Sequence, residues 1–269
     1  MFRPPPLACD CHIHVFGPFD RYTLAAQRKY TPGPATLADY LKVASALGTG
    51  RVVLVQPSIY GTDNSCQRDA LRELGERGRG VAVIDEATSD GELRDLNGAG
   101  FEGARLNLVR AGDLDSLERL AARVKEYDWH VQLHLEAATL AKIAPRLLKL
   151  PTDFVIDHFG RIDPRAGPGQ PAFQALLDLL DSGRCWVKLS APYRVDLEGA
   201  PYHRLTTFAR ELVKRNPERL VWGTDWPHPD VPVVPEDQAL LDALADWVPH
   251  EAARKRILVD NPAKLYGFL

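Results

Sequence analysis

The stretch that decides the fold runs from Asp113 to Glu136 and reads DLDSLERLAARVKEYDWHVQLHLE. Its first half carries apolar side chains at helical spacing: Leu114, Leu117, Leu120, Ala121 and Val124. This spacing predicts an amphipathic helix over residues 113–127. The second half, from His130 to Leu135, alternates between polar and apolar residues as a half-buried strand does. A helix that leads directly into a strand is the repeating unit of a parallel α/β sheet.

Similar units recur along the whole chain. The predicted strands are Leu7–Cys11, Arg51–Gln56, Gly80–Ile84, Gly103–Asn107, His130–Leu135, Asp153–Asp157, Cys185–Leu189 and Leu220–Gly223. The predicted helices are Thr36–Leu47, Asn64–Arg77, Ser89–Ala99, Asp113–Tyr127, Ala138–Leu148, Pro171–Leu180, Tyr202–Asn216, Pro235–Trp247 and, at the end, Glu251–Val259. Eight strands, each followed by a helix, predict an α/β fold: a closed (β/α)8 barrel, or TIM barrel, spanning residues 1–269 as a single domain. An open doubly wound sheet is the alternative, but no glycine-rich phosphate-binding turn follows the first strand.

The composition is that of a globular protein without a strong charge bias. The chain has 269 residues, 45% of them hydrophobic, and a formal net charge of −3. This balance does not predict binding to nucleic acid or to a membrane surface. No apolar run approaches the roughly 18 residues of a membrane span, and residues 1–10 lack the apolar stretch of a secretory signal. We therefore expect a cytoplasmic protein whose four cysteines are reduced thiols.

Two cysteines and two histidines alternate near the N-terminus. A regular strand over Cys9–His14 places Cys9 and Cys11 on one face, and His12 and His14 on the other. On this reading the cysteines do not share a metal with the histidines.

Polar residues follow several predicted strands at the end where TIM-barrel active sites lie. His12 and His14 end the first strand, and two imidazoles at this spacing can ligate a metal or polarise a carbonyl oxygen. His134 lies near the end of the fifth strand. His158 ends the sixth strand. Asp225 ends the eighth; because Trp-Pro rather than a helix follows it, a capping role explains it poorly.

Further polar residues lie close behind these strand ends. His228 follows Asp225 by three residues. The arginines at this level are Arg105, Arg110, Arg161 and Arg194. Because a guanidinium can bind a carboxylate through two hydrogen bonds, several arginines at one barrel mouth predict an anionic substrate.

These motifs together resemble the amidohydrolase-related metal-dependent hydrolases. Within them the chain is similar to the branch that contains 2-pyrone-4,6-dicarboxylate lactonase and D-galactarolactone isomerase. The resemblance spans essentially the whole chain. It is carried by CDCHIHVFGP (9–18), YTP (30–32), VVLVQPSIYG (52–61), GARLNLVR (103–110), WHVQLHLE (129–136), DHFGR (157–161), WVKLSAPYR (186–194), VWGTDWPHP (221–229) and DNP (260–262).

The resemblance implies the hydrolysis of a small carboxylated lactone. It implies that the lactone carbonyl oxygen lies against His12, His14 and His158. Asp225 is then the general base toward water, and it later returns a proton to the leaving oxygen. The substrate-binding residues that it implies are Tyr30, Ser58, Arg105, Arg161 and Arg194. Three further candidates follow from their positions close to predicted strand ends at the barrel mouth: Arg110, His134 and His228.

The sequence departs from this branch on the fifth strand, where His134 stands in place of the lactonase tyrosine. The resemblance favours catalysis without a cofactor. A single divalent metal, Zn²⁺ or Mn²⁺, held by His12, His14, His134 and Asp225 is the alternative, as in a mononuclear metal-dependent hydrolase or decarboxylase of the superfamily. A lactone isomerase is a further alternative, and retention of Asp225 favours hydrolysis over it. The expected partner is a small anionic lactone, without nucleic acid or membrane, and the protein is expected to be a monomer or a homo-oligomer.

Overall fold

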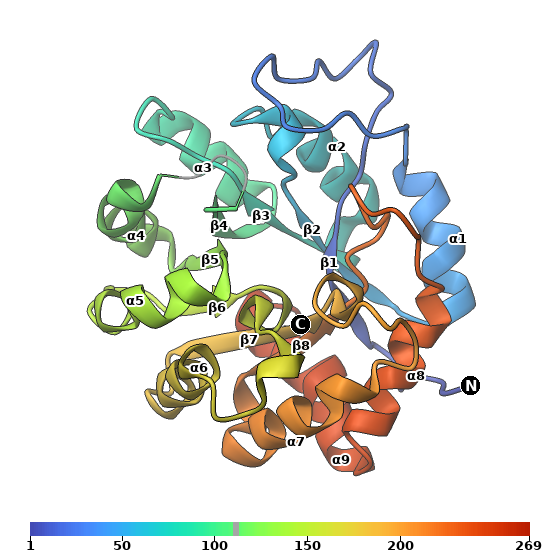
Figure 1. Ribbon diagram of the computed structural model, residues 1–269. Helices are drawn as coiled ribbons and strands as arrows, with labels where there is room; N and C mark the ends of the chain where they lie inside the picture. Colours follow the sequence, from blue (N-terminus) through green and yellow to red (C-terminus); the bar gives the residue numbers. More distant parts are fainter. Residues whose placement is uncertain (110–112) are drawn as a thin grey trace.

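The structure, a computed structural model, describes residues 1–109 and 113–269. Eight parallel strands pair in sequence order (Figure 1). They are β1 (Cys9–Ile13), β2 (Arg51–Val55), β3 (Gly78–Ala82), β4 (Phe101–Asn107), β5 (His130–His134), β6 (Phe154–Ile156), β7 (Cys185–Ser190) and β8 (Leu220–Gly223). Just past β8, a parallel bridge between Ile13 and Trp226 joins the two edges of the sheet. The predicted (β/α)8 barrel is confirmed, and the open sheet is excluded.

Helices cover the outside of the barrel (Figure 1). They are α1 (Leu37–Leu47), α2 (Ser65–Leu74), α3 (Asp90–Gly98), α4 (Leu117–Val124), α5 (Ala137–Leu147), α6 (Pro171–Asp181), α7 (Thr206–Arg215), α8 (Asp237–Trp247), α9 (Glu251–Lys255) and α10 (Asn261–Tyr266). Two of them begin at capping boxes, in which Thr36 and Ser89 accept from the backbone three residues on. These local signals explain why the starts of α1 and α3 lie within one residue of the predicted starts.

The C-terminal region differs from the prediction. The expected helix Glu251–Val259 is α9 followed by a π-helical turn, Arg256–Asp260, which leads into α10. Pro262 lies in the first turn of α10, where its missing N–H costs no hydrogen bond. The sequence prediction ended before this helix.

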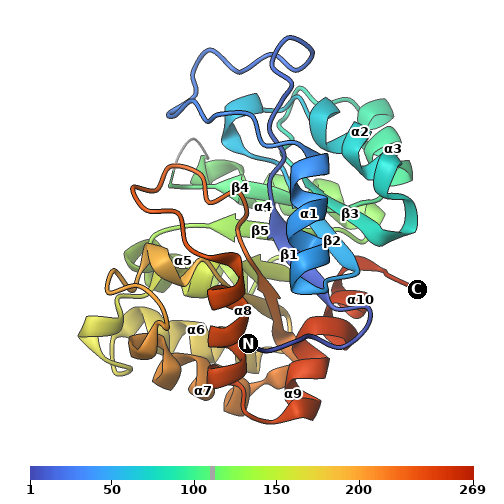
Figure 2. The same ribbon diagram turned by 90° about the vertical axis from the view of Figure 1, so that its right-hand side faces the viewer.

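The hydrophobic core has two parts. One lies between the strands and the helices. The other fills the barrel with residues such as Val53, Val81 and Val155, and it includes Tyr266 and Phe268 from the C-terminal segment. Figure 2 shows α10 and the C-terminus at one end of the barrel, away from the long connections that follow β7 and β8.

The first strand is irregular, which overturns the predicted division of its side chains between two faces. Two residues of β1, Cys11 and His12, stand opposite the single residue Val53 of β2, because the register shifts between Asp10 and Ile13. Such a bulge turns consecutive side chains to the same side. Cys11 packs in the barrel interior with Val53, and His12 also lies inside the barrel, where it faces side chains of strands across it.

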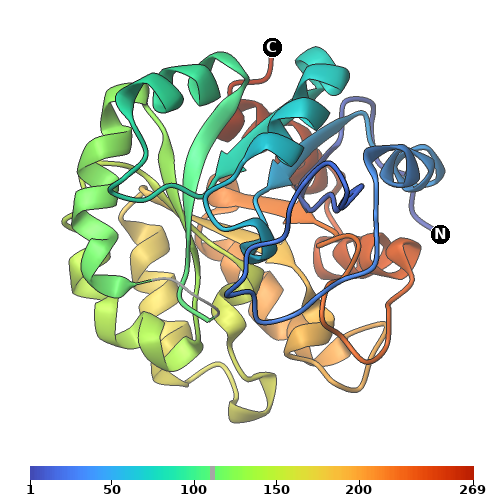
Figure 3. The same cartoon turned by 90° about the horizontal axis from the view of Figure 1, so that it is seen from above.

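The connection between β1 and α1, coloured dark blue, lies against the β2–α2 connection (Figure 3). The Ala25 amide donates to the Ile59 carbonyl at 2.7 Å, and the Gly17 amide donates to the Tyr60 hydroxyl at 2.8 Å. These contacts fix the two segments that carry Tyr30 and Ser58 to the barrel mouth.

Candidate active site

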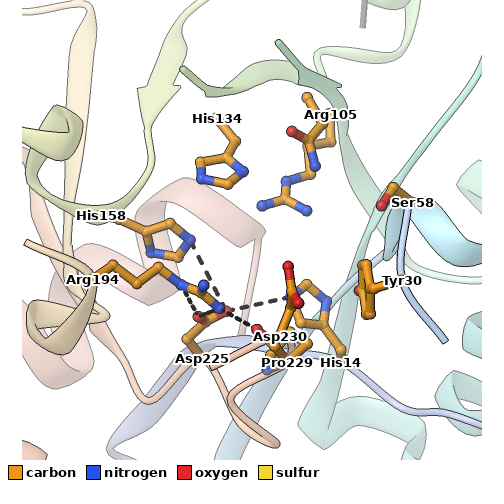
Figure 4. A pocket seen from close by; sticks show the side chains of 11 residues that line it. His14, Tyr30, Ser58, Arg105, His134, His158, Arg194, Asp225, Pro229 and Asp230 are labelled. Atoms are coloured by element: carbon orange, nitrogen blue, oxygen red, sulfur yellow. Dashed lines mark hydrogen bonds and ion pairs between the residues drawn. The ribbon is translucent and has the colours of Figure 1, made fainter. Parts of the chain in front are cut away.

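A cavity opens at the C-terminal ends of the strands. It is lined by His14, Tyr30, Ser58, Arg105, Asn107, His134, His158, Arg194, Asp225, Pro229 and Asp230. Figure 4 shows His14, His158 and Arg194 around Asp225, with Arg105 and His134 across the cavity from them.

The closure of the barrel brings the central residues together. The Asp225 amide donates to the His12 carbonyl, and the His14 amide donates to the Trp226 carbonyl, both at 2.8 Å. These two backbone hydrogen bonds join the end of β1 to the segment after β8. The His-x-His motif and the aspartate therefore meet because the sheet closes, although more than 200 residues separate them in sequence.

Three imidazoles surround one oxygen of Asp225. Asp225 Oδ1 lies 3.3 Å from Nε2 of His14, 3.6 Å from Nε2 of His12 and 4.0 Å from Nε2 of His158. All four side chains are buried. His14, His158 and Asp225 reach the cavity, whereas His12 lies beneath its surface.

The other oxygen of Asp225 is held by two donors. Asp225 Oδ2 accepts from the Tyr193 hydroxyl at 2.7 Å and from Arg194 Nε at 2.9 Å. Burial by itself raises the pKa of the Asp225 carboxyl, but the Arg194 guanidinium beside it outweighs burial and holds the pKa well below its usual value. Asp225 is therefore a carboxylate at neutral pH, with Oδ1 left to accept a proton.

Two of the imidazoles are neutral. Burial lowers the pKa of His12 to about 3 and the pKa of His158 well below its usual value. His12 Nδ1 lies 3.4 Å from Asp157 Oδ1 and 3.4 Å from Lys188 Nζ, so a buried carboxylate and a buried ammonium both orient this ring.

The protonation of His14 follows from its hydrogen bond. His14 Nδ1 lies 2.6 Å from the Val55 carbonyl oxygen, which can only accept, so Nδ1 carries a proton. In the neutral ring, Nε2 therefore presents a lone pair toward Asp225.

This donor set fits a divalent metal ion. Among the described residues, His12, His14 and Asp225 bring ligand atoms within 4.8 Å of one another, as do His12, Asp157 and His158. His12 Nε2 is buried and has no hydrogen-bond partner within the described part of the chain. Two imidazoles and a carboxylate, with Asp157 behind His12, resemble the ligands and supporting carboxylate of zinc sites. His134, which the sequence prediction placed in the metal set, belongs to neither described group.

The predicted arginines occupy different positions. Arg105 lines the cavity and is held from below by Asp157, at 3.2 Å from Nε and 3.1 Å from Nη2. Arg194 lines the cavity beside Asp225. Arg161 is not among the lining residues described above, and its Nε lies 3.2 Å from Glu136 Oε1. Arg110 lies outside the described residues.

The two remaining histidines also differ in position. His134 lines the cavity, and burial lowers its pKa well below the usual value. His228 is buried behind Asp225, where it contacts Tyr193 and Asp237 instead of the cavity.

Several residues of the site were not predicted from the sequence. Asn107, Pro229 and Asp230 line the cavity, and Tyr193 contacts Asp225. Tyr193 immediately precedes a predicted site residue, Arg194, and Asp157 precedes His158. For Tyr193 and Asp157, this adjacency to a predicted site residue was the only indication in the sequence. A buried residue that contacts a site residue follows no spacing pattern of its own.

No helix in the described part of the chain is long and apolar enough to cross a membrane. This finding agrees with the hydropathy of the sequence.

Comparison with known proteins places the chain among lactone-processing enzymes. It is 38% identical to a 4-sulfomuconolactone hydrolase of Hydrogenophaga intermedia, over 99% of this chain and 90% of that protein. It is 37% identical to a 2-pyrone-4,6-dicarboxylate hydrolase of Comamonas testosteroni, over 98% and 92%. The structure of a probable 2-pyrone-4,6-dicarboxylic acid hydrolase from Acinetobacter baumannii, with citric acid bound, superposes with a TM-score of 0.86 and 30% identity, over 97% and 100% of the two chains. Residues 9–268 match the amidohydrolase family, and the chain belongs to that family.

Proposed function

We propose that this protein hydrolyses a small carboxylated lactone, with Asp225 as the general base. The observation that carries the proposal is the placement of Asp225. One oxygen is held by Tyr193 and Arg194, and the other faces three imidazole nitrogens at the floor of the cavity. The lactone hydrolases among the relatives support the reaction type, and cavity-lining Arg105 and Arg194 support an anionic substrate.

In the proposed reaction, Asp225 Oδ1 takes a proton from water as the water oxygen bonds to the lactone carbonyl carbon. The His158 imidazole at the floor of the cavity, whose Nδ1 is paired with the Ser190 hydroxyl, donates from Nε2 to the carbonyl oxygen and stabilises the negative charge that develops there. The ring C–O bond then breaks, and the proton on Asp225 passes to the leaving oxygen. The product is an open-chain hydroxy acid, and Asp225 is again a carboxylate.

His12, His14 and Asp225 are the residues that would hold a divalent ion, which supplies Lewis-acid polarisation and a more acidic water when it is bound. The tasks of the chain's other residues are unchanged. Arg105 and Arg194 bind the carboxylates of the substrate, and His134 contacts its ring.

A panel of lactones tests the proposal. Carboxylated and uncharged lactones are incubated with the protein, with and without added Zn²⁺ or Mn²⁺, and acid release is followed with a pH indicator. We expect acid release from carboxylated lactones. Consumption of a lactone without acid release would indicate isomerisation instead, and no consumption of any lactone would refute the proposal. Loss of activity with a chelator and recovery with added metal would assign a metal-dependent reaction.

A further inference from the structure

We propose that Tyr193, His228 and Asp237 form a hydrogen-bonded chain that positions the Asp225 carboxylate for proton transfer. This inference rests on the proposed function and adds three positioning residues to it. It also gives His228 a role that differs from the substrate contact predicted from the sequence.

The chain begins at the oxygen of Asp225 that faces away from the imidazoles. The Tyr193 hydroxyl donates its only proton to Asp225 Oδ2 at 2.7 Å. The same hydroxyl oxygen lies 3.1 Å from His228 Nδ1. His228 Nε2 lies 2.9 Å from Asp237 Oδ1. Because the Asp237 carboxylate can only accept, His228 Nε2 carries a proton and donates to it.

The distances indicate where the Tyr193 proton lies. The Tyr193 hydroxyl is 2.7 Å from the Asp225 carboxylate and 3.1 Å from His228 Nδ1, so its shorter hydrogen bond is to Asp225. The side chains of His228 and Asp225 are buried, whereas that of Asp237 is 21% exposed. The chain thus runs from the floor of the cavity to the first turn of α8, and it connects the carboxylate to a rigid element.

The backbone at the same place reinforces this arrangement. The His228 amide donates to the Asp225 carbonyl at 2.7 Å. Both residues have positive φ angles, 65° for Asp225 and 59° for His228. Residues other than glycine adopt this conformation only when the surrounding structure stabilises it. The Tyr193 and Asp237 contacts provide such stabilisation.

Neither Tyr193, His228 nor Asp237 is among the residues that line the described cavity. They therefore act through Asp225 rather than on the substrate. A positioning role predicts a lower kcat with little change in KM, because the substrate contacts remain.

Tyr193→Phe tests the chain by removing one hydroxyl group. With a lactone that the wild-type protein hydrolyses, we expect kcat to fall roughly 10-fold or more, as when partners behind a site residue are removed, and KM to stay within about twofold. The matched control is Tyr202→Phe, which removes a buried tyrosine hydroxyl from the same β7–α7 connection and should leave kcat unchanged. Equal kcat values for Tyr193→Phe and the wild type would overturn the inference.

Asp237, the last residue of the hydrogen-bonded chain, provides a second test that does not alter the cavity. Asp237→Asn keeps an acceptor oxygen for His228 Nε2, and Asp237→Ala removes it. We expect Asp237→Asn to retain most of the wild-type kcat and Asp237→Ala to lose it, at unchanged KM. If both variants lose kcat equally, or neither does, the chain does not position Asp225.

A third measurement separates this inference from the proposed function, because it needs no substrate. In crystal structures of the wild type and Tyr193→Phe, we expect the Asp225 carboxylate to rotate in the variant, away from its position beside Nε2 of His14. An unchanged carboxylate would overturn the inference even for an active lactonase. A rotated carboxylate would support it even if the lactone panel gave no acid.

Discussion

At the scale of single residues, the two oxygens of Asp225, the general base that we propose, have different surroundings. One oxygen, Oδ2, makes hydrogen bonds to Tyr193 and Arg194, and these keep the carboxylate ionised. The other oxygen, Oδ1, faces the imidazoles. A carboxylate with a lowered pKa is deprotonated at neutral pH. Its strength as a base therefore depends on the side chains that contact its two oxygens, and not on a pKa near 7.

Asp225→Asn removes the proton acceptor and preserves the shape of the side chain. We expect kcat to fall by at least roughly 100-fold, the scale of general-base catalysis, with the unfolding temperature little changed. Steady-state kinetics and thermal unfolding measure both effects. Asp230→Asn, a change to a second carboxylate of the cavity, is the control. A larger loss in Asp230→Asn than in Asp225→Asn would move the base assignment to Asp230.

Arg194→Met tests the charge that lowers the pKa of Asp225. Because the Arg194 guanidinium favours the ionised carboxylate, its removal should raise that pKa. The acid limb of the pH profile of kcat/KM should then move to higher pH, and KM should rise for a carboxylated lactone. Arg161→Met is the matched control, since Arg161 pairs with Glu136 away from Asp225. An acid limb that moves equally in both variants would contradict this reading.

Site residues at strand ends could be predicted from the sequence, because the C-terminal ends of all strands meet at the same end of a barrel. His12, His14, His158 and Asp225 were identified in this way, and the structure places them within a few ångströms of one another. The direction of a side chain beyond the strand was not predictable. Arg161 turns toward Glu136, although the sequence pattern resembles that of the cavity-lining Arg194.

At the scale of elements, the joint between β1 and β8 determines whether the site forms. Asp10 connects the two strands on the outer side of the barrel: its Oδ1 accepts from the Thr224 amide at 2.9 Å, and its Oδ2 accepts from the Thr224 hydroxyl at 2.6 Å. The sequence predicted both strands but not the bulge in β1. A bulge depends on how two strands pair in register, and neither strand alone carries that information.

Gly223→Ala tests how closely the two strands must approach. A Cβ at Gly223 would lie 2.6 Å from the His12 amide nitrogen and 2.8 Å from His12 Cβ. Because a backbone atom cannot yield easily, we expect a destabilisation of roughly 1–3 kcal/mol together with reduced kcat. Gly98→Ala in α3 is the control; nothing lies within 4 Å of its Cβ, so it should be neutral or stabilising. Chemical denaturation compares them, and equal stability of the two variants would contradict the close approach.

Asp10→Asn tests the pH dependence of the same joint. Burial raises the pKa of Asp10 from 3.8 to about 6, although hydrogen bonds from Thr224 oppose this shift. The folded state therefore binds this proton more tightly than the unfolded state. Its stabilising contribution is complete below about pH 4 and is lost as the pH rises through 6. The difference in unfolding free energy, wild type minus Asp10→Asn, should decrease by roughly 2 kcal/mol between pH 4 and pH 7. A difference independent of pH would mean that Asp10 does not titrate in this way.

At the scale of the whole molecule, the two ends of the barrel have separate tasks. The C-terminal end of the strands carries the cavity and the titratable side chains. The opposite end is covered by the C-terminal segment, where Tyr266 and Phe268 pack against the apolar residues inside the barrel. This division is expected of (β/α)8 barrels, so the sequence sufficed to predict it in outline. The use of the chain's last residues as a cover was not predicted, because helix α10 was not recognised.

Phe268→Ala should therefore change stability without changing catalysis. Phe268 is buried, and the guanidinium groups of Arg51 and Arg79 lie 5.2 and 4.8 Å from the centre of its ring. Removal of this ring should cost roughly 3 kcal/mol or more, measured by denaturation. At temperatures where the variant is folded, kcat and KM should equal those of the wild type, because the cavity lies at the other end of the barrel. Leu269→Ala, which alters the fully exposed neighbouring side chain, should affect neither property. A loss of kcat in folded Phe268→Ala would show that the two ends are coupled, and the division of tasks would then be wrong.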